Sequence, residues 1–113
     1  MQFSGIVQKG AQRGRLLGYP TINIPLSDSS IAGVYAARVS VRESAPYMAA
    51  VFADPRRQLL EAYLLDFSDD LYGQCVEINL HQKIREARSF DSVEDLKQAI
   101  ADDVQAVRQY FHV

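Results

Sequence analysis

Two polar residues separated by one apolar residue, Thr21 and Asn23, form the first candidate site in the sequence. They follow Pro20 in a predicted short strand over residues 21–24, in which residues two apart share a face. The Thr21 hydroxyl and the Asn23 amide oxygen therefore project together, with Ile22 on the opposite face. Such oxygens can hold a Mg²⁺ ion that already carries phosphate groups, because Mg²⁺ takes few protein ligands in phosphoryl-transfer sites. The alternative interpretation is an exposed polar strand face.

A glycine-rich basic segment over residues 10–18 precedes this strand. Glycines let backbone N–H groups turn toward an anion, and neighbouring arginines add electrostatic attraction. The residues concerned are Gly10, Arg13, Gly14, Arg15 and Gly18. The segment is not a Walker A loop, because Ala11 and Gln12 stand where lysine and serine or threonine are needed. It is a candidate anion-binding loop, and the alternative is a flexible hairpin loop with solvated charges.

A carboxylate, Glu61, lies in a predicted strand over residues 59–67 whose two faces are both largely apolar. Glu61 shares its face with Leu59, Tyr63, Leu65 and Phe67, whereas the other face carries Leu60, Ala62, Leu64 and Asp66. We therefore expect Glu61 near the interior or the mouth of the folded sheet, where a carboxylate can take a proton from a hydroxyl nucleophile. The alternative is an edge glutamate that is solvated or paired with Arg56 or Arg57.

Composition argues against several classes of protein. The net charge of -2 and the pI of about 5.6 disfavour broad nucleic-acid binding, which usually needs a basic excess. Cys75 is the one cysteine, so no intrachain disulfide can form. The N-terminal residues lack the pattern of a signal peptide, and no run approaches the roughly 18 apolar residues of a membrane span. We expect a single cytoplasmic domain over residues 1–113, without nucleic-acid or membrane partners. The sequence does not determine the oligomeric state, although a monomer is slightly favoured.

Six strand-like segments and one helix must position the candidate residues. Apolar alternation and turn residues predict strands over 1–7, 21–24, 33–42, 47–53, 59–67 and 74–82. A helix of roughly five turns follows, capped by Ser92 with Asp95, because apolar residues then recur every three or four positions. These are Val93, Leu96, Ile100, Val104, Val107 and Phe111. The helix cannot bury its apolar stripe alone, so we expect a small β-barrel closed on one side by the helix.

Taken in order along the chain, these segments resemble the riboflavin kinase family, including the kinase half of bacterial bifunctional FAD synthetases. Residues 5–10 and 13–23, the latter ending in Tyr-Pro-Thr-Ile-Asn, resemble the nucleotide loop and the Pro-Thr-Ala-Asn motif of the family. Residues 60–67, with Asp-Leu-Tyr-Gly at 70–73, resemble the strand and turn that carry the catalytic acid residue. Residues 83–92 and the helix resemble the flavin-side segment, so the resemblance covers nearly the whole chain.

The resemblance implies a six-stranded antiparallel, Greek-key-like β-barrel with a C-terminal α-helix. It implies transfer of a phosphoryl group from ATP to the terminal ribityl hydroxyl of riboflavin, which gives FMN and ADP. By matching position, Thr21 and Asn23 would bind Mg²⁺ and the nucleotide phosphates, and Glu61 would activate the hydroxyl. The loop over residues 10–18 would cover the phosphates. Tyr72, Gly73 and Arg85 would lie beside the flavin.

The chain departs from the family pattern just before residue 59. Family members carry a longer segment there, of the form Asn-x-Gly-x-x-Pro-Thr, which residues 50–58 lack. Tyr63 stands where histidine is frequent, and Ala87 where glutamate is common. An adenylyltransferase half is missing, so we expect no FAD synthesis from this chain. The alternative function is a non-catalytic flavin- or nucleotide-binding module on the same barrel. An oligonucleotide-binding barrel is disfavoured by the acidic balance.

Overall fold

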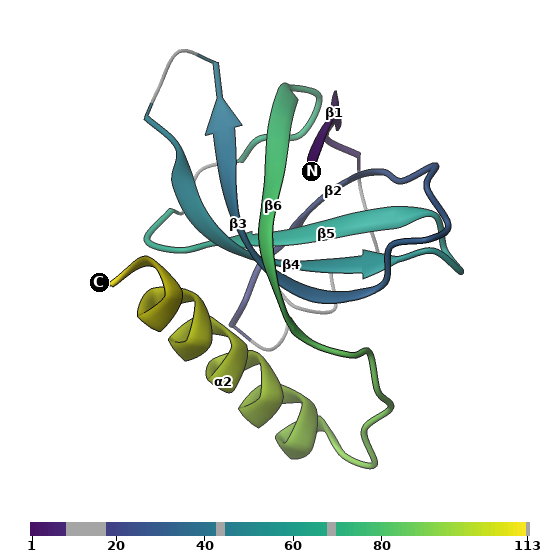
Figure 1. Cartoon of the computed structure of the whole chain (residues 1–113), viewed down its shortest axis with the longest axis vertical. Helices are drawn as coiled ribbons and strands as arrows, with labels where there is room; N and C mark the ends of the chain where they lie inside the picture. The colour runs from purple at the N-terminus through teal and green to yellow at the C-terminus, as the bar shows by residue number, and fades with distance from the viewer. Residues whose placement is uncertain (9–17, 43–44, 68–69, 113) are drawn as a thin grey trace.

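Six antiparallel strands curl into a barrel, and one helix packs against its outside, in the computed structural model (Figure 1). The structure describes residues 1–8, 18–42, 45–67 and 70–112. The strands are β1 (Gln2–Ile6), β2 (Ile22–Pro25), β3 (Gly33–Val41), β4 (Tyr47–Asp54), β5 (Leu59–Leu64) and β6 (Cys75–Arg85), and the helix is α2 (Val93–Phe111). Their order in the sheet is β1-β6-β3-β4-β5-β2, so the predicted mainly β fold with a C-terminal helix is confirmed.

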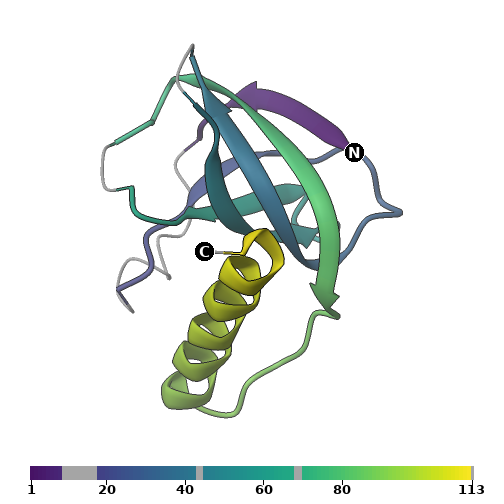
Figure 2. The same ribbon diagram turned by 60° about the vertical axis from the view of Figure 1, so that its left-hand side comes forward.

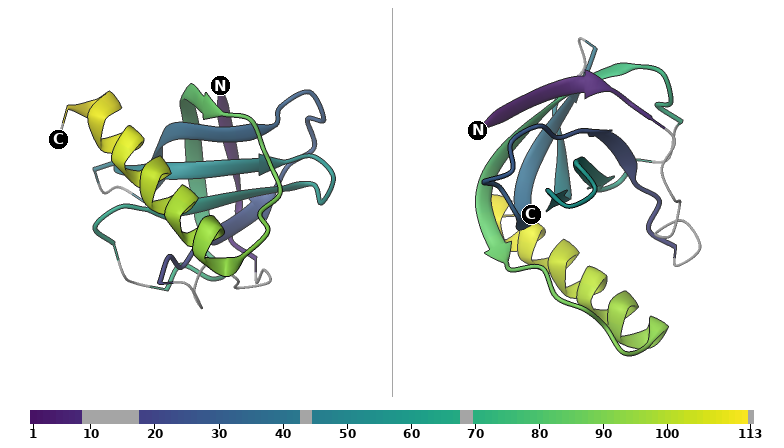
Figure 3. Two further views of the ribbon diagram at one scale, coloured as in Figure 1. Left: turned by 90° about the horizontal axis from the view of Figure 1, so that it is seen from below. Right: turned by 90° about the vertical axis from the view of Figure 1, so that its right-hand side faces the viewer.

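The two edge strands, β1 and β2, approach each other and nearly close the barrel. A Cβ atom on Gly5 of β1 would lie only 3.2 Å from the Cβ of Ile24 in β2, so the absence of a side chain allows this approach. Just beyond β1, the Gln8 backbone N–H donates to the Asn23 carbonyl at 2.7 Å. The curl of the strands is visible in the right-hand view of Figure 3.

The barrel interior is filled by alternate side chains of the strands, because successive residues of a strand point to opposite faces. In β5 the inward residues Leu60 and Ala62 have no exposed surface, and Leu64 is 4% exposed. Alternate residues of β3 and β4, among them Val39 and Val51, complete the same cluster. Each buried leucine or valine side chain among them contributes about 1.5–3 kcal/mol.

Helix α2 begins where the sequence predicts, because the Ser92 side chain accepts a hydrogen bond from the Asp95 backbone N–H at 3.1 Å. Its C-terminal half packs through Val107 against Leu65 and Ala36, outside the barrel. The helix diverges from the strands toward its N-terminus (Figure 2). Val93 was expected on the packed stripe but is 61% exposed, because the first turn stands off the barrel. None of the described helices is long and apolar enough to cross a membrane.

Two strand ends differ from the predicted ones by more than one residue. β5 ends at Leu64, not at residue 67, because Asp66 adopts a left-handed φ of 58° and turns the chain. β6 continues to Arg85, beyond the predicted end at residue 82, because Lys83 and Arg85 pair with Tyr35 and Val34 of β3. The longer β6 carries Arg85 to the side of the barrel where α2 begins.

Candidate active site

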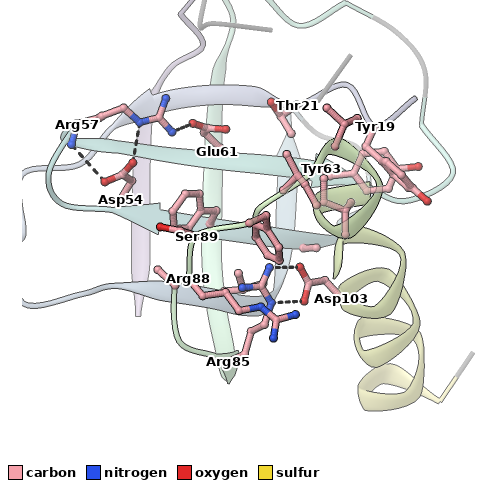
Figure 4. A pocket seen from close by; sticks show the side chains of 18 of the residues that line it. Tyr19, Thr21, Asp54, Arg57, Glu61, Tyr63, Arg85, Arg88, Ser89 and Asp103 are labelled. Carbon is pink, nitrogen blue, oxygen red and sulfur yellow. Dashed lines mark hydrogen bonds and ion pairs between the residues drawn. The ribbon is translucent and has the colours of Figure 1, made fainter. Parts of the chain in front are cut away.

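A cleft of about 750 Å³ lies between the outer face of the barrel and the segment that leads into α2. One wall comes from β2, β4 and β5, and the other from residues 85–93 and the first half of α2 (Figure 4). Its size is that of pockets that bind small-molecule ligands. Its lining contains the predicted residues Thr21, Asn23, Glu61 and Arg85.

Three of the predicted site residues share the barrel wall of the cleft. Asn23 lies directly opposite Glu61 in the β2–β5 pairing, and Thr21 is two positions before Asn23. Ile22 packs toward the barrel core on the other face, which confirms the predicted alternation. The Asn23 side chain is buried, and it lines the cleft. An amide and a hydroxyl in this setting fit the ligand chemistry of Mg²⁺.

Glu61 lies outside the barrel and not in its interior, so that part of the expectation is wrong. Both faces of β5 are apolar in sequence, and the interior is filled by Leu60, Ala62 and Leu64. The Glu61 side chain, 23% exposed, opens instead into the cleft and pairs with Arg57. The arginine pairing foreseen as the alternative interpretation therefore occurs, and it occurs inside the candidate site.

The turn between β4 and β5 supplies this arginine. Arg57 Nε donates to Asp54 Oδ2 at 2.6 Å, while its Nη2 donates to Glu61 Oε1. Partial burial alone would raise the pKa of Asp54, but the hydrogen bonds from Arg57 and from backbone N–H groups lower it below its ordinary value. The hydrogen bond to Asp54 and the nearby charge of Glu61 raise the pKa of Arg57, against the effect of burial.

The opposite wall of the cleft carries a group of apolar side chains beside charged ones. Phe90, Val93, Leu96 and Ile100 line it, and the Arg88 guanidinium stacks on the Phe90 ring at 5.0 Å from the ring centroid. Because Val93 does not pack on the barrel, its exposed side chain is available to a bound ligand. The start of α2 and the segment before it thus offer apolar surface to a ligand.

Arg85 is fixed in the cleft by an acidic residue that sequence reasoning missed. Its Nε and Nη2 donate to the two carboxylate oxygens of Asp103, each at 2.8 Å. Asp103 is 6% exposed, although a carboxylate in a helix is ordinarily expected on the solvent face. Its spacing offered a signal, because Asp103 lies three residues after Ile100 and four before Val107, on the apolar stripe.

Two aromatic rings border the same cleft. Tyr19 and Tyr63 meet edge to face, with ring centroids 5.3 Å apart and an interplanar angle of 80°. Tyr63 is on the Glu61 face of β5, and Tyr19 precedes β2 by three residues. The pair therefore lies beside the polar part of the barrel wall, as Figure 4 shows.

Three predicted site residues in the described ranges do not line the cleft. Tyr72 and Gly73 are exposed in the turn before β6, and the Gly73 N–H donates to the Val7 carbonyl at 3.0 Å. Gly18 is exposed and has a φ of 87°. Gly10, Arg13, Gly14 and Arg15 lie outside the described residues. No group of three or more histidine, cysteine, aspartate or glutamate side chains forms a metal site in the described ranges.

A family model for riboflavin kinase, the flavokinase model, matches residues 1–111. The chain belongs to the riboflavin kinase family. It is 39% identical over 116 residues to the bifunctional riboflavin kinase/FMN adenylyltransferase of Escherichia coli K12, covering 96% of this chain and 37% of that protein. It is 36% identical over 117 residues to a trifunctional protein of Mycoplasmoides gallisepticum, covering 96% of this chain and 18% of that protein. The chain thus spans well under half the length of these relatives.

Solved structures share the fold. The riboflavin kinase of Trypanosoma brucei superposes with a TM-score of 0.72 at 32% identity, covering 98% of this chain and 79% of that one. A Streptococcus pneumoniae structure described as a macrolide-efflux protein gives a TM-score of 0.81 at 30% identity, covering 95% and 38%. The agreement with a riboflavin kinase extends over the barrel and the helix together, and these two elements form the walls of the cleft.

Proposed function

We propose that this chain transfers the terminal phosphoryl group of ATP to the terminal ribityl hydroxyl of riboflavin, giving FMN and ADP. The observation that carries the proposal is the composition of one cleft. A hydroxyl, an amide and a carboxylate, from Thr21, Asn23 and Glu61, share its barrel wall. The opposite wall carries apolar side chains, among them Phe90 and Leu96, that suit a flat aromatic ring. Membership of the riboflavin kinase family supports the same reaction.

In this proposal Thr21 and Asn23 would hold Mg²⁺ together with the phosphates of the nucleotide. When bound, the ion neutralises the charge that develops on the phosphate oxygens. Glu61 takes the proton of the ribityl hydroxyl as its oxygen forms a bond to the γ-phosphorus. The bond from that phosphorus to the bridging oxygen of ADP breaks, and ADP leaves with the electron pair. Positioning and charge neutralisation account for most of the catalysis of phosphoryl transfer.

The flavin ring is proposed to lie along the wall formed by residues 85–93 and the start of α2. Phe90 and Leu96 offer it apolar surface, and the exposed Val93 extends that surface toward the mouth of the cleft. The ribityl chain then reaches across the cleft toward Glu61. Arg85, held by Asp103, fixes the position of this wall relative to the barrel.

The remaining functional assignments are part of the same proposal. The small molecules bound are riboflavin or FMN and ATP or ADP, with Mg²⁺ as the metal. Three residues that do not line the cleft are also proposed to contact the bound ligands. They are Gly18, at the end of the loop over residues 10–18, and Tyr72 and Gly73. A cytoplasmic setting without nucleic-acid or membrane partners fits the acidic composition.

The decisive experiment mixes pure protein with riboflavin and Mg-ATP and follows FMN by chromatography. We expect FMN to form, and Glu61→Gln to lower kcat about 10²- to 10⁴-fold, the usual contribution of a positioned general base. Riboflavin binding, measured by quenching of its fluorescence, should be retained in this variant. Glu77→Gln is the matched control, because Glu77 is exposed on β6 and bonds to Gln2 away from the cleft.

Two outcomes would contradict the proposal. If flavin binds but no FMN forms at high protein concentration, the chain is a binding module that retains the barrel. If FMN forms and Glu61→Gln keeps the full rate, Glu61 is not the base.

A further inference from the structure

The short turn between β4 and β5 places one guanidinium between two carboxylates of the cleft. Arg57 bonds through Nε to Asp54 and through Nη2 to Glu61, and these contacts lie on the side of Glu61 away from Thr21 (Figure 4). The turn occupies the position where the family pattern has a longer segment. Arg57 therefore belongs to the part of this chain that departs from that pattern.

Asp54 organises this turn from its start. Its Oδ1 accepts the backbone N–H groups of Arg56 at 3.1 Å and of Arg57 at 3.3 Å, while its Oδ2 accepts Arg57 Nε. One carboxylate thus fixes both the backbone and the guanidinium of Arg57. Pro55 restricts the turn further, because its ring locks φ. An aspartate is ionised at neutral pH, so this support is present under the conditions of the proposed reaction.

Glu61 gains a defined orientation from this arrangement. Its side chain has three rotatable bonds and projects into the cleft, where Arg57 binds its carboxylate. Arg57 engages Oε1, which leaves Oε2 to accept a proton from a hydroxyl. An arginine fork suits this task because its donors lie in one plane and can serve two acceptors at once.

We propose that Arg57, itself held by Asp54, is a positioning residue that orients Glu61 for proton abstraction. The inference rests on the proposed function, since it assigns Arg57 a part in the same reaction. The shortened turn therefore keeps a role in catalysis. It supplies its own support for the carboxylate.

The test measures FMN formation by Arg57→Ala, Arg57→Lys and Asp54→Asn. Arg57→Ala should lower kcat about 10- to 100-fold, because a displacement of about 1 Å at a reacting group can cost that much. The KM values for riboflavin and Mg-ATP should change by less than about threefold. Arg57→Lys should recover part of the rate, since an ammonium can pair with Glu61 but cannot reproduce the fork. Asp54→Asn should act in the same direction.

A double-variant cycle separates positioning from a general structural effect. If Arg57 acts through Glu61, adding Arg57→Ala to Glu61→Gln should cause no further loss of kcat. Arg108→Ala is the matched control, because it breaks an arginine–carboxylate pair with Asp66 outside the cleft, and its kcat should equal that of the parent. Thermal unfolding of each variant shows whether the fold is kept.

The outcomes that overturn the inference differ from those that overturn the reaction. A kcat that is unchanged or raised in Arg57→Ala, or losses that multiply independently in the double variant, would exclude the positioning role while FMN formation stands. A folded Arg57→Lys with no recovered rate, beside an equally slow Arg57→Ala, would also count against it. If the parent protein forms no FMN at all, the proposed function fails and the inference fails with it.

Discussion

At the scale of single residues, the buried carboxylate Asp103 offers a test of how firmly the wall of the cleft is held. Asn at this position would leave the Arg85 guanidinium, whose side chain is only 23% exposed, without its charged partner. Breaking a fully buried pair costs about 3–5 kcal/mol, and the partial exposure of Arg85 reduces our expectation for Asp103→Asn to about 2 kcal/mol. Urea unfolding followed by circular dichroism measures this change in the free energy of unfolding.

The matched control at this scale is Asp66→Asn. Asp66 also pairs with an arginine, Arg108 of α2, but the Asp66 side chain is 68% exposed. Solvent screens such pairs, so the expected change is below about 1 kcal/mol. Equal losses in Asp103→Asn and Asp66→Asn would show that the buried pair has no special structural role.

At the scale of elements, Gly33 is a glycine that the packing of β3 on β6 requires. A Cβ atom there would lie 2.6 Å from the Arg85 carbonyl oxygen and 2.7 Å from Lys83 Cε, and its φ is 106°. Gly33→Ala should therefore destabilise the protein and displace Arg85 from the cleft. Gly73→Ala also meets a positive φ, of 81°, but finds open space, so it carries strain of about 1–3 kcal/mol without the clash.

The difference between these two alanine variants isolates the steric contact. We expect Gly33→Ala to unfold at a lower urea concentration than Gly73→Ala, and its KM for riboflavin to rise, because the Arg85 wall borders the proposed flavin position. A stability equal to that of Gly73→Ala would mean that the ends of β3 and β6 separate easily and do not fix the cleft.

Elements were predictable where their pattern is local. The six strands and the helix follow from periodicity, and the Ser92 cap follows from its side chain. The end of β5 was not predictable, since the apolar run continues through Leu65, which packs against α2 after the strand has ended. The side of β5 that faces the interior was equally hidden, because both faces are apolar.

The candidate site was likewise predictable only where its residues follow a local pattern. Thr21, Asn23 and Glu61 were found from strand alternation and family resemblance, and the cleft brings them together. The Arg85–Asp103 pair joins residues 18 positions apart across two elements, which no local pattern encodes. The position of Tyr72 away from the cleft likewise depends on how the turn before β6 pairs with residues after β1.

At the scale of the whole molecule, the cleft lies between two layers, the barrel and α2, which pack together through Val107 in the second half of the helix. The left-hand view of Figure 3 shows the helix crossing the strands diagonally. A ligand that touches both walls should stabilise their packing by mass action, by about 2.7 kcal/mol at a concentration of 100 times its Kd. The two substrates should stabilise different segments of the chain, because the proposal assigns them to opposite walls.

Hydrogen exchange followed by mass spectrometry tests this assignment without turnover. Riboflavin alone should slow exchange over residues 86–100, where amides lie in an exposed segment and the first turns of α2. Mg-ADP alone should slow exchange over residues 19–25 and leave residues 86–100 little changed. Asp103→Asn should weaken the riboflavin effect, since the wall that contains Arg85 is then less firmly held. Protection by riboflavin that is confined to β2 and β5 would place the flavin on the barrel wall, and the orientation proposed for the two substrates would be wrong.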